Sequence, residues 1–159
     1  MPNSSLLIVG AAVLVVVLFF IFQIGGGRHK FLSKPLLTEN EIEFFGRLKK
    51  ALPDYEIFPQ VALKAFIKPG ASSGSKQFWA ELGKIGSKHC DFLVCKPGTY
   101  EVVAIIELDD RSHDSKKDAE RDAMTMAAGF KTLRFESRRK PRPEEVHAAV
   151  MRLLSAAKA

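Results

Sequence analysis

The stretch AIIELDDRSH, residues 104–113, starts as a run of apolar, β-forming side chains and ends in three acids, an arginine and a histidine. Such a run predicts a strand buried in a sheet, with a charged C-terminal end. Because side chains alternate along a strand, Glu107 and Asp109 are expected on the same face of the sheet. A strand end of this kind either faces water or forms a metal site.

The sequence just before this strand predicts a hairpin. CDFLVC, residues 90–95, is typical of a second buried strand, and KPGT, residues 96–99, is typical of the turn that leads into YEVVAIIELD. A hairpin places the start of its first strand beside the end of its second strand. We therefore expect Asp91 to lie near Glu107 and Asp109.

Three carboxylates at one end of a sheet repel one another unless a cation neutralises them. Mg²⁺ or Mn²⁺ fits best, because both prefer oxygen ligands. The expected ligands are Asp91 and Glu107. The alternative is that these acids simply end a strand and face water, and for Asp110 alone that is the better interpretation.

A fourth acid, Glu41, belongs to the segment LTENEIEFFGRLKKAL, which predicts a helix from about Thr38 to Leu52. Glu41 falls within the apolar arc of that helix, and an acid on a buried face is costly unless it is paired or bound to metal. Thr38 and Glu41 also fit a capping box, which would keep the acid at the helix start. Both interpretations stay open. The side chains expected on the apolar arc are Ile42, Phe45, Leu48 and Leu52.

The rest of the domain alternates between strand and helix patterns. In chain order these are a strand at 55–67, a loop at 68–77, a helical turn at 78–86, a helix at 115–129 ended by Gly129, a strand at 130–136 and a helix from Pro143 onward. The apolar face expected on the 115–129 helix consists of Ala119, Ala123, Met126 and Ala127. This order predicts a mixed α/β domain in which a central sheet carries helices on its faces.

The N-terminal segment has a different character. The first 27 residues contain no Lys, Arg, Asp or Glu, and the run from Leu6 to Ile24 is apolar except for Gly10 and Gln23. Such a run would span about 28 Å as a helix, close to the hydrocarbon thickness of a bilayer. It predicts a transmembrane helix over 5–24. A cleaved signal peptide is the alternative, which the small residues at 25–27 would suit.

Positive charge follows this run at once. Arg28, Lys30 and Lys34 lie in a short linker, residues 25–35, that separates the helix from the domain at 36–159. The positive-inside rule then predicts a single-pass protein of the inner, cytoplasmic membrane, with its C-terminal domain in the cytoplasm. The two cysteines are too few for a disulfide framework, and reduced thiols agree with that compartment.

A second basic cluster lies in SRRKPRP, residues 137–143. The net charge of the chain is +6, and the two basic clusters account for it, so the rest of the domain is expected to be about neutral. Arg138, Arg139 and Lys140 are candidates for contact with nucleic-acid phosphates. A charge run in a proline-bounded loop is otherwise simply solvated.

Taken together, these segments resemble known families. DFLVC followed by IIELDDRSHDSKKDAERDAMTMAAGFKTLRF resembles the restriction-endonuclease-like superfamily, the PD-(D/E)XK nucleases. It is most similar to the branch near the very-short-patch-repair endonuclease, in which an E-x-D-x-x-x-H string ends the second hairpin strand. LTENEIEFFGRLKKAL, FPQVAL and DFLVCKPGTYEVVAIIELDDRSH also resemble the bacterial domain-of-unknown-function family 2726. The resemblance covers residues 36–154.

The resemblance implies roles for individual residues. Asp91 and Glu107 match the metal-binding acids of the superfamily, and Glu41 matches its helix-borne acid. The usual lysine of E-x-K is absent, and Asp109 stands in its place. His113 matches the histidine of the repair-endonuclease branch and would accept or donate a proton.

The predicted function is that of a membrane-anchored, metal-dependent nuclease that hydrolyses phosphodiester bonds in DNA or RNA. The ion would polarise a phosphate oxygen and lower the pKa of bound water. The alternative is a degenerate nuclease fold that binds nucleic acid or a protein partner at the membrane without cutting, which the missing lysine favours. A purely structural role for the acids is the third interpretation. The sequence does not indicate an oligomeric state.

Overall fold

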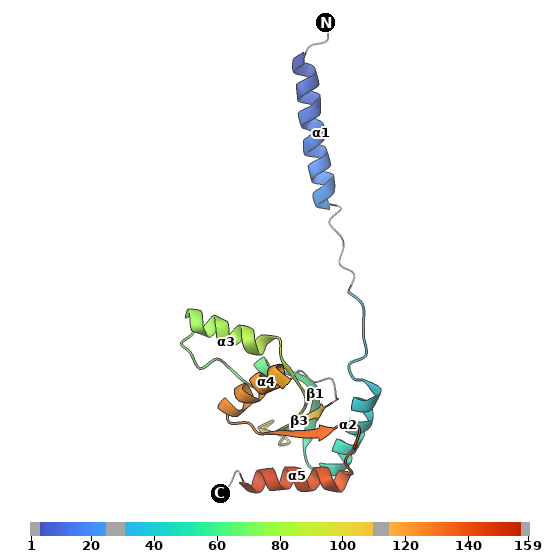
Figure 1. Ribbon diagram of the computed structural model, residues 1–159, viewed down its shortest axis with the longest axis vertical. Coiled ribbons are helices and arrows are strands. Elements are labelled where there is room, and N and C mark those ends of the chain that lie inside the picture. Colours follow the sequence, from blue (N-terminus) through green and yellow to red (C-terminus); the bar gives the residue numbers. More distant parts are fainter. Residues whose placement is uncertain (1–3, 25–30, 110–114, 157–159) are drawn as a thin grey trace. The chain divides into compact units, whose positions relative to one another are not determined.

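The computed structural model describes residues 4–24, 31–109 and 115–156. The chain divides into two compact units, Met1–Lys34 and Pro35–Ala159. The first unit contains one helix, α1 (Ser4–Ile24), and the second contains all the other elements (Figure 1).

The apolar N-terminal segment forms a helix, as its pattern predicts, and the described side chains of α1 are exposed. Over the residues that the structure describes, no helix is long and apolar enough to cross a membrane. The transmembrane helix predicted over 5–24 is therefore not found.

The second unit is built on one mixed sheet of four strands in the order β1-β2-β3-β4. The first three strands are antiparallel, and β4 runs parallel to β3. The strands are β1 (Glu56–Ala62), β2 (His89–Cys95), β3 (Val102–Asp109) and β4 (Thr132–Glu136). The predicted hairpin is confirmed as β2 and β3. The parallel pair needs a crossover, and the helix between β3 and β4 supplies it.

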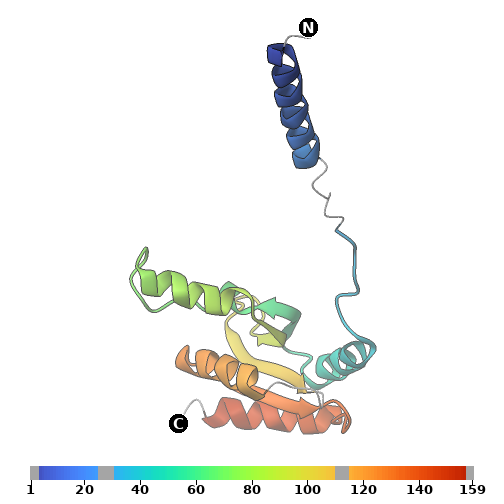
Figure 2. The same cartoon turned by 45° about the horizontal axis from the view of Figure 1, so that its top comes forward.

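Helices cover both faces of this sheet, as the element order predicts. They are α2 (Glu39–Ala51), α3 (Lys76–Gly86), α4 (Ser115–Ala127) and α5 (Pro143–Ala156), with a 3₁₀ turn at Leu63–Ala65. One core joins α2 and α5 to Phe92, Val94, Ala104 and Ile106 of the hairpin. The other joins the 3₁₀ turn and α3 to Leu93, Cys95 and Ile105. Figure 2 shows α3 and α5 on opposite sides of the strands.

Two predicted helix faces are wrong in detail. On α2 the buried side chains are Phe44, Leu48 and Ala51, whereas Ile42 is 57% exposed. Phe44 packs on Phe92 of β2 with ring centroids 5.6 Å apart, and this contact selects the face. The rest of the predicted arc is confirmed, because Leu48 and Leu52 are buried and Phe45 packs against the core. A helical wheel does not identify the neighbouring aromatic ring that buries Phe44.

The predicted apolar face of α4 is also wrong. Ala119, Ala123 and Ala127 are exposed and Met126 is 73% exposed, whereas Thr125 is buried. The side of α4 that packs on the domain carries the buried Thr125, Arg121, which pairs with Glu107 of β3, and Met124, which packs on the core. Two elements differ in length from the prediction. The helical turn expected at 78–86 is a complete helix, α3, and Ser75 caps its start, because Ser75 Oγ accepts from Phe78 N at 3.0 Å. The strand expected at 55–67 ends at Ala62.

Candidate functional site

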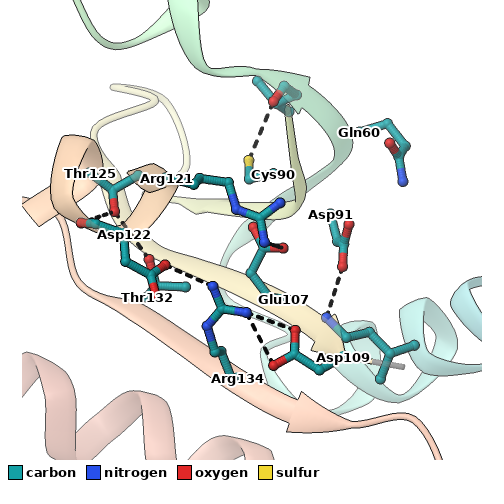
Figure 3. A network of polar contacts seen from close by, with 12 residues as sticks. Gln60, Cys90, Asp91, Glu107, Asp109, Arg121, Asp122, Thr125, Thr132 and Arg134 are labelled. Atoms are coloured by element: carbon teal, nitrogen blue, oxygen red, sulfur yellow. Dashed lines mark hydrogen bonds and ion pairs between the residues drawn. The ribbon is translucent and has the colours of Figure 1, made fainter. Parts of the chain in front are cut away.

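One polar residue from each strand forms a row across the sheet (Figure 3). Pro59 pairs with Phe92 and Val61 pairs with Cys90, so the register places Gln60 of β1 opposite Asp91 of β2. Phe92 pairs with Ile106, so Asp91 in turn lies opposite Glu107 of β3. Glu107 pairs with Arg134 of β4. We call these four side chains, Gln60, Asp91, Glu107 and Arg134, the polar row.

Glu107 is the most buried member of the row, with 1% of its surface exposed. Neither carboxylate oxygen has a hydrogen-bond donor within the described part of the chain. The guanidinium of Arg121 on α4 lies close to it, with Nη2 3.0 Å from Oε2. A buried carboxylate without donors is costly, so this position favours a proton or a cation.

The electrostatics of Glu107 agree with its surroundings. Burial raises the pKa of Glu107 to about 8, and the charge of Asp91 raises it further, while Arg121 and Arg134 oppose the shift. Near neutral pH this carboxyl group therefore holds a proton for much of the time.

Asp91 is held beside Glu107 by the backbone of the neighbouring strand. Its Oδ2 accepts a hydrogen bond from Leu108 N at 2.8 Å. Asp91 thus lies at the end of the β2–β3 ladder and is half-buried. The predicted proximity of Asp91 to Glu107 follows from this register.

Asp109 has a different environment from the one predicted for it. Arg134 Nη1 donates to both of its carboxylate oxygens, at 2.9 and 3.1 Å. Arg134 Nη2 donates to Asp122 Oδ1 of α4 at 2.8 Å. Burial lowers the pKa of Arg134, but the hydrogen bonds from Arg134 to Asp122 and Asp109 have the larger effect, so the pKa of Arg134 is raised overall. Arg134 of β4 therefore joins Asp109 of β3 to Asp122 of α4.

Glu41 joins the polar row from α2. The capping box is confirmed, because Thr38 N donates to Glu41 Oε2 at 2.6 Å and Glu41 N donates to Thr38 Oγ1 at 3.3 Å. The other oxygen, Oε1, accepts from Gln60 Nε2 at 2.8 Å. The helix cap considered for Glu41 is thus confirmed, and the same side chain is also hydrogen-bonded to Gln60.

Gln60 is the residue of the row that the sequence did not single out. Its φ of +52° lies in the left-handed region, which costs a non-glycine residue about 1–3 kcal/mol. Such strain persists where surrounding contacts impose it, and functional sites are where it concentrates. Here the contact is the hydrogen bond to Glu41.

The predicted basic cluster begins beside the same strand ends. Ser137 N donates to Asp109 O at 2.9 Å, which places the next residues, Arg138 and Arg139, at the end of β3 and exposed. Lys140 forms an ion pair with Glu43 of α2. Arg138 and Arg139 therefore remain the better candidates for a phosphate contact.

The predicted metal site is only partly assembled by the described residues. His113 lies outside them, as do residues 110–114 in general. In the described ranges no group of three or more His, Cys, Asp or Glu side chains could hold a metal ion. Asp91 and Asp109 both lie close enough to Glu107 to raise its pKa, and Asp109 also accepts hydrogen bonds from Arg134.

The raised pKa of Glu107 predicts a pH dependence of stability in the presence of a chelator. Its pKa in the folded protein is about 8 and its ordinary value is 4.5, so protonation favours the folded state. This contribution is complete below pH 4.5 and is lost as the pH rises through about 8. It amounts to roughly 3–5 kcal/mol over that window. Chemical denaturation at pH 5, 7 and 9 measures it. The Glu107→Gln chain is the control and should lack this slope; an equal slope in both chains would contradict the assignment.

Comparison with known proteins gives one match. The family model described as "Protein of unknown function (DUF2726)" matches residues 33–153 of the chain. No curated protein and no solved structure matches.

Proposed function

The chain belongs to the DUF2726 family, and from this premise we propose that its domain is a metal-dependent nuclease that hydrolyses phosphodiester bonds of nucleic acid. The observation that carries the proposal is the Glu107 carboxylate, which is buried, lacks hydrogen-bond donors among the described residues and lies beside Asp91. Two adjacent carboxylates of this kind favour a divalent cation with oxygen ligands.

Asp91 and Glu107 would hold the ion, Mg²⁺ or Mn²⁺. When bound, such an ion polarises a phosphate oxygen and lowers the pKa of a bound water molecule. Leu108 N orients the Asp91 carboxylate, and Arg121 lies at the Glu107 carboxylate. We propose that Arg121 supplies, from α4, the positive charge that the absent E-x-K lysine would supply at position 109. His113 is the proposed proton donor or acceptor.

The proposed fold is restriction-endonuclease-like. In support, a helix precedes an antiparallel three-stranded meander, and a crossover helix then leads to a strand parallel to β3. The acids lie on the meander and the proposed Arg121 on the crossover helix. The E-x-D-x-x-x-H string of the sequence, Glu107 to His113, resembles the very-short-patch-repair branch of that superfamily.

A second candidate function is supported by a specific observation. Arg121 lies against Glu107, and Arg134 holds Asp109, so both acids have protein cations nearby without any metal. Such pairing suits a degenerate nuclease domain that binds nucleic acid, or a protein partner, without cutting it.

A cleavage assay distinguishes the two candidates. The full chain is incubated with single-stranded and duplex DNA and RNA, each with Mg²⁺, with Mn²⁺ and with a chelator. The nuclease proposal expects fragments of at least one substrate that require the metal. Intact substrates under every condition, together with salt-dependent binding, would favour the binding module instead.

Localisation at a membrane is a further part of the proposal. In support, α1 leaves large apolar side chains such as Leu7, Phe19 and Phe20 more than half exposed, and isolated apolar surface of that extent usually finds a partner. In cell fractionation, we expect the full chain to sediment with membranes and to be released by detergent and not by salt. A chain that starts at Leu36 should stay in the supernatant. Recovery of the full chain in the supernatant would contradict membrane attachment.

A further inference from the structure

A third concentration of positive charge lies between β1 and β2 in the sequence. Residues 63–88 contain five lysines and one acid, Glu81. Glu81 is turned to its own loop, because Oε2 accepts from Gly70 N at 3.1 Å and from Ala71 N at 3.2 Å. The lysines are Lys64, Lys68, Lys76, Lys84 and Lys88, of which the first four are exposed. The sequence pattern had suggested a domain that is neutral away from its two basic clusters, and this segment is an exception.

Helix α3 carries an exposed indole within this basic segment. Trp79 is the only tryptophan of the chain and is 61% exposed. The packed side of α3 is formed by Leu82 and Ile85, which belong to the core on that face of the sheet. Trp79 contacts Phe78 edge to face, with centroids 5.4 Å apart, so its ring is steadied from one side.

The neighbours of Trp79 on the helix surface leave room over its ring. Lys76 precedes it by three residues and Gly83 follows it by four, so both lie on the same side of α3. Gly83 has no side chain and Ala80 has a small one. Proteins that bind single strands stack unpaired bases on exposed aromatic rings and bind the phosphates with nearby positive charges. Trp79 and Lys76 provide one ring and one positive charge a helical turn apart.

We propose that α3 and the lysines around it form a binding surface for single-stranded nucleic acid, with a base stacked on Trp79. A single strand is required because the faces of paired bases are already stacked within a duplex. This inference names the substrate class of the proposed nuclease and in that sense rests on the proposed function, although binding does not require cleavage.

The position of α3 connects this surface to the polar row. The helix ends at Gly86, and Asp91 lies five residues further along the chain. Figures 1 and 2 show the first turns of α3 reaching beyond the strands, while its last turn meets the start of β2. From Trp79 to Gly86 is about 10 Å of helix. A strand bound along α3 would therefore run toward the acids.

An anionic lipid surface is the competing occupant, and the packing of α3 disfavours it. A helix that lies in a membrane interface inserts a continuous apolar face. On α3 that face, Leu82 and Ile85, is packed against the domain core. Trp79 alone provides no such face.

The test uses the fluorescence of Trp79 in the full chain, with a chelator present to prevent cleavage. A thymidine oligonucleotide should quench the emission, and a duplex of equal length should quench it less. Raising the salt concentration should weaken the binding. Unchanged emission at saturating oligonucleotide would overturn the proposal. A response to vesicles of phosphatidylglycerol and phosphatidylcholine without any response to the oligonucleotide would overturn it in favour of lipid.

Variants are compared by the anisotropy of a labelled oligonucleotide. Trp79→Ala should weaken the affinity roughly 5- to 150-fold, the range for one stacked base, and Trp79→Phe should weaken it less. The Lys76→Gln/Lys84→Gln chain should reduce the salt slope by about 1.4, since each phosphate contact to a single strand contributes about 0.7. The matched control is Lys50→Gln/Lys131→Gln, which removes two exposed charges elsewhere. Equal losses in both double variants would overturn the assignment to α3.

Different experimental results would contradict the α3 binding surface and the nuclease proposal. Quenching that persists in Glu107→Gln, or in a wild-type chain that cuts nothing, supports the α3 surface independently of catalysis. Cleavage by a chain whose Trp79 does not respond to the oligonucleotide would overturn the α3 surface and leave the nuclease proposal standing.

Discussion

Replacement of Glu107 by Gln is expected to lower nucleic-acid cleavage by about 10³-fold or more. A bound metal ion contributes several kcal/mol of transition-state stabilisation, and each 1.36 kcal/mol corresponds to a factor of ten in rate. The amide that replaces the carboxylate has the same shape but no charge with which to hold the ion. The measurement is the single-turnover rate of cleavage, with wild type and variant assayed on the same substrate.

The fold of the Glu107→Gln chain should survive. The amide is isosteric with the carboxyl group, and its oxygen can still accept from Arg121, whose Nη2 lies 3.0 Å from Oε2 of Glu107. Circular dichroism checks this directly. Glu136→Gln is the matched control, because it makes the same change at the exposed end of β4, and it should leave the rate unchanged. Cleavage that persists in Glu107→Gln would defeat the site assignment and would indicate another acid cluster or a contaminating nuclease.

Addition of Mn²⁺ or Mg²⁺ at a hundredfold excess over its dissociation constant is the second large effect. Binding to the folded state alone stabilises it by about 2.7 kcal/mol, which corresponds to a rise of about 10 °C in Tm for a domain of this size. At one fixed metal concentration, the gain should be larger at pH 8.5 than at pH 6.5. Metal must displace the proton that Glu107 holds with a pKa of about 8, and that displacement becomes easier as the pH rises.

Asp91→Asn should remove most of this gain, since one of the two proposed ligands is lost. Asp54→Asn, at an exposed turn, is the control and should retain the full rise in Tm. Thermal scans at both pH values, with metal and with chelator, make the comparison. If metal leaves the Tm of the wild-type chain unchanged at either pH, Glu107 and Arg121 are better understood as a structural ion pair, and the binding module becomes the favoured function.

Local signals in the sequence were sufficient to predict most of the helices and strands. The Thr38–Glu41 capping box starts α2, and Pro143 begins α5. Gly129, at φ +85°, follows the end of α4. Each of these signals acts within a few residues, so it can be recognised without knowing the fold. The β2–β3 hairpin was also predictable, and with it the approach of Asp91 to Glu107, because a short turn fixes which residues meet.

The counter-charges and the strain depended on the tertiary structure. Arg121 and Arg134 reach the acids from α4 and β4, and their choice of partner follows from the parallel pairing of β3 with β4, which no local signal encodes. The same pairing turned Asp109 from a predicted site acid into the partner of Arg134. Gln60, whose backbone is left-handed, donates to Glu41, nineteen residues away in the chain. Charge partners and strain are set by side chains that meet only after the sheet has formed, so the sequence determined the elements and the tertiary structure decided how the site is neutralised.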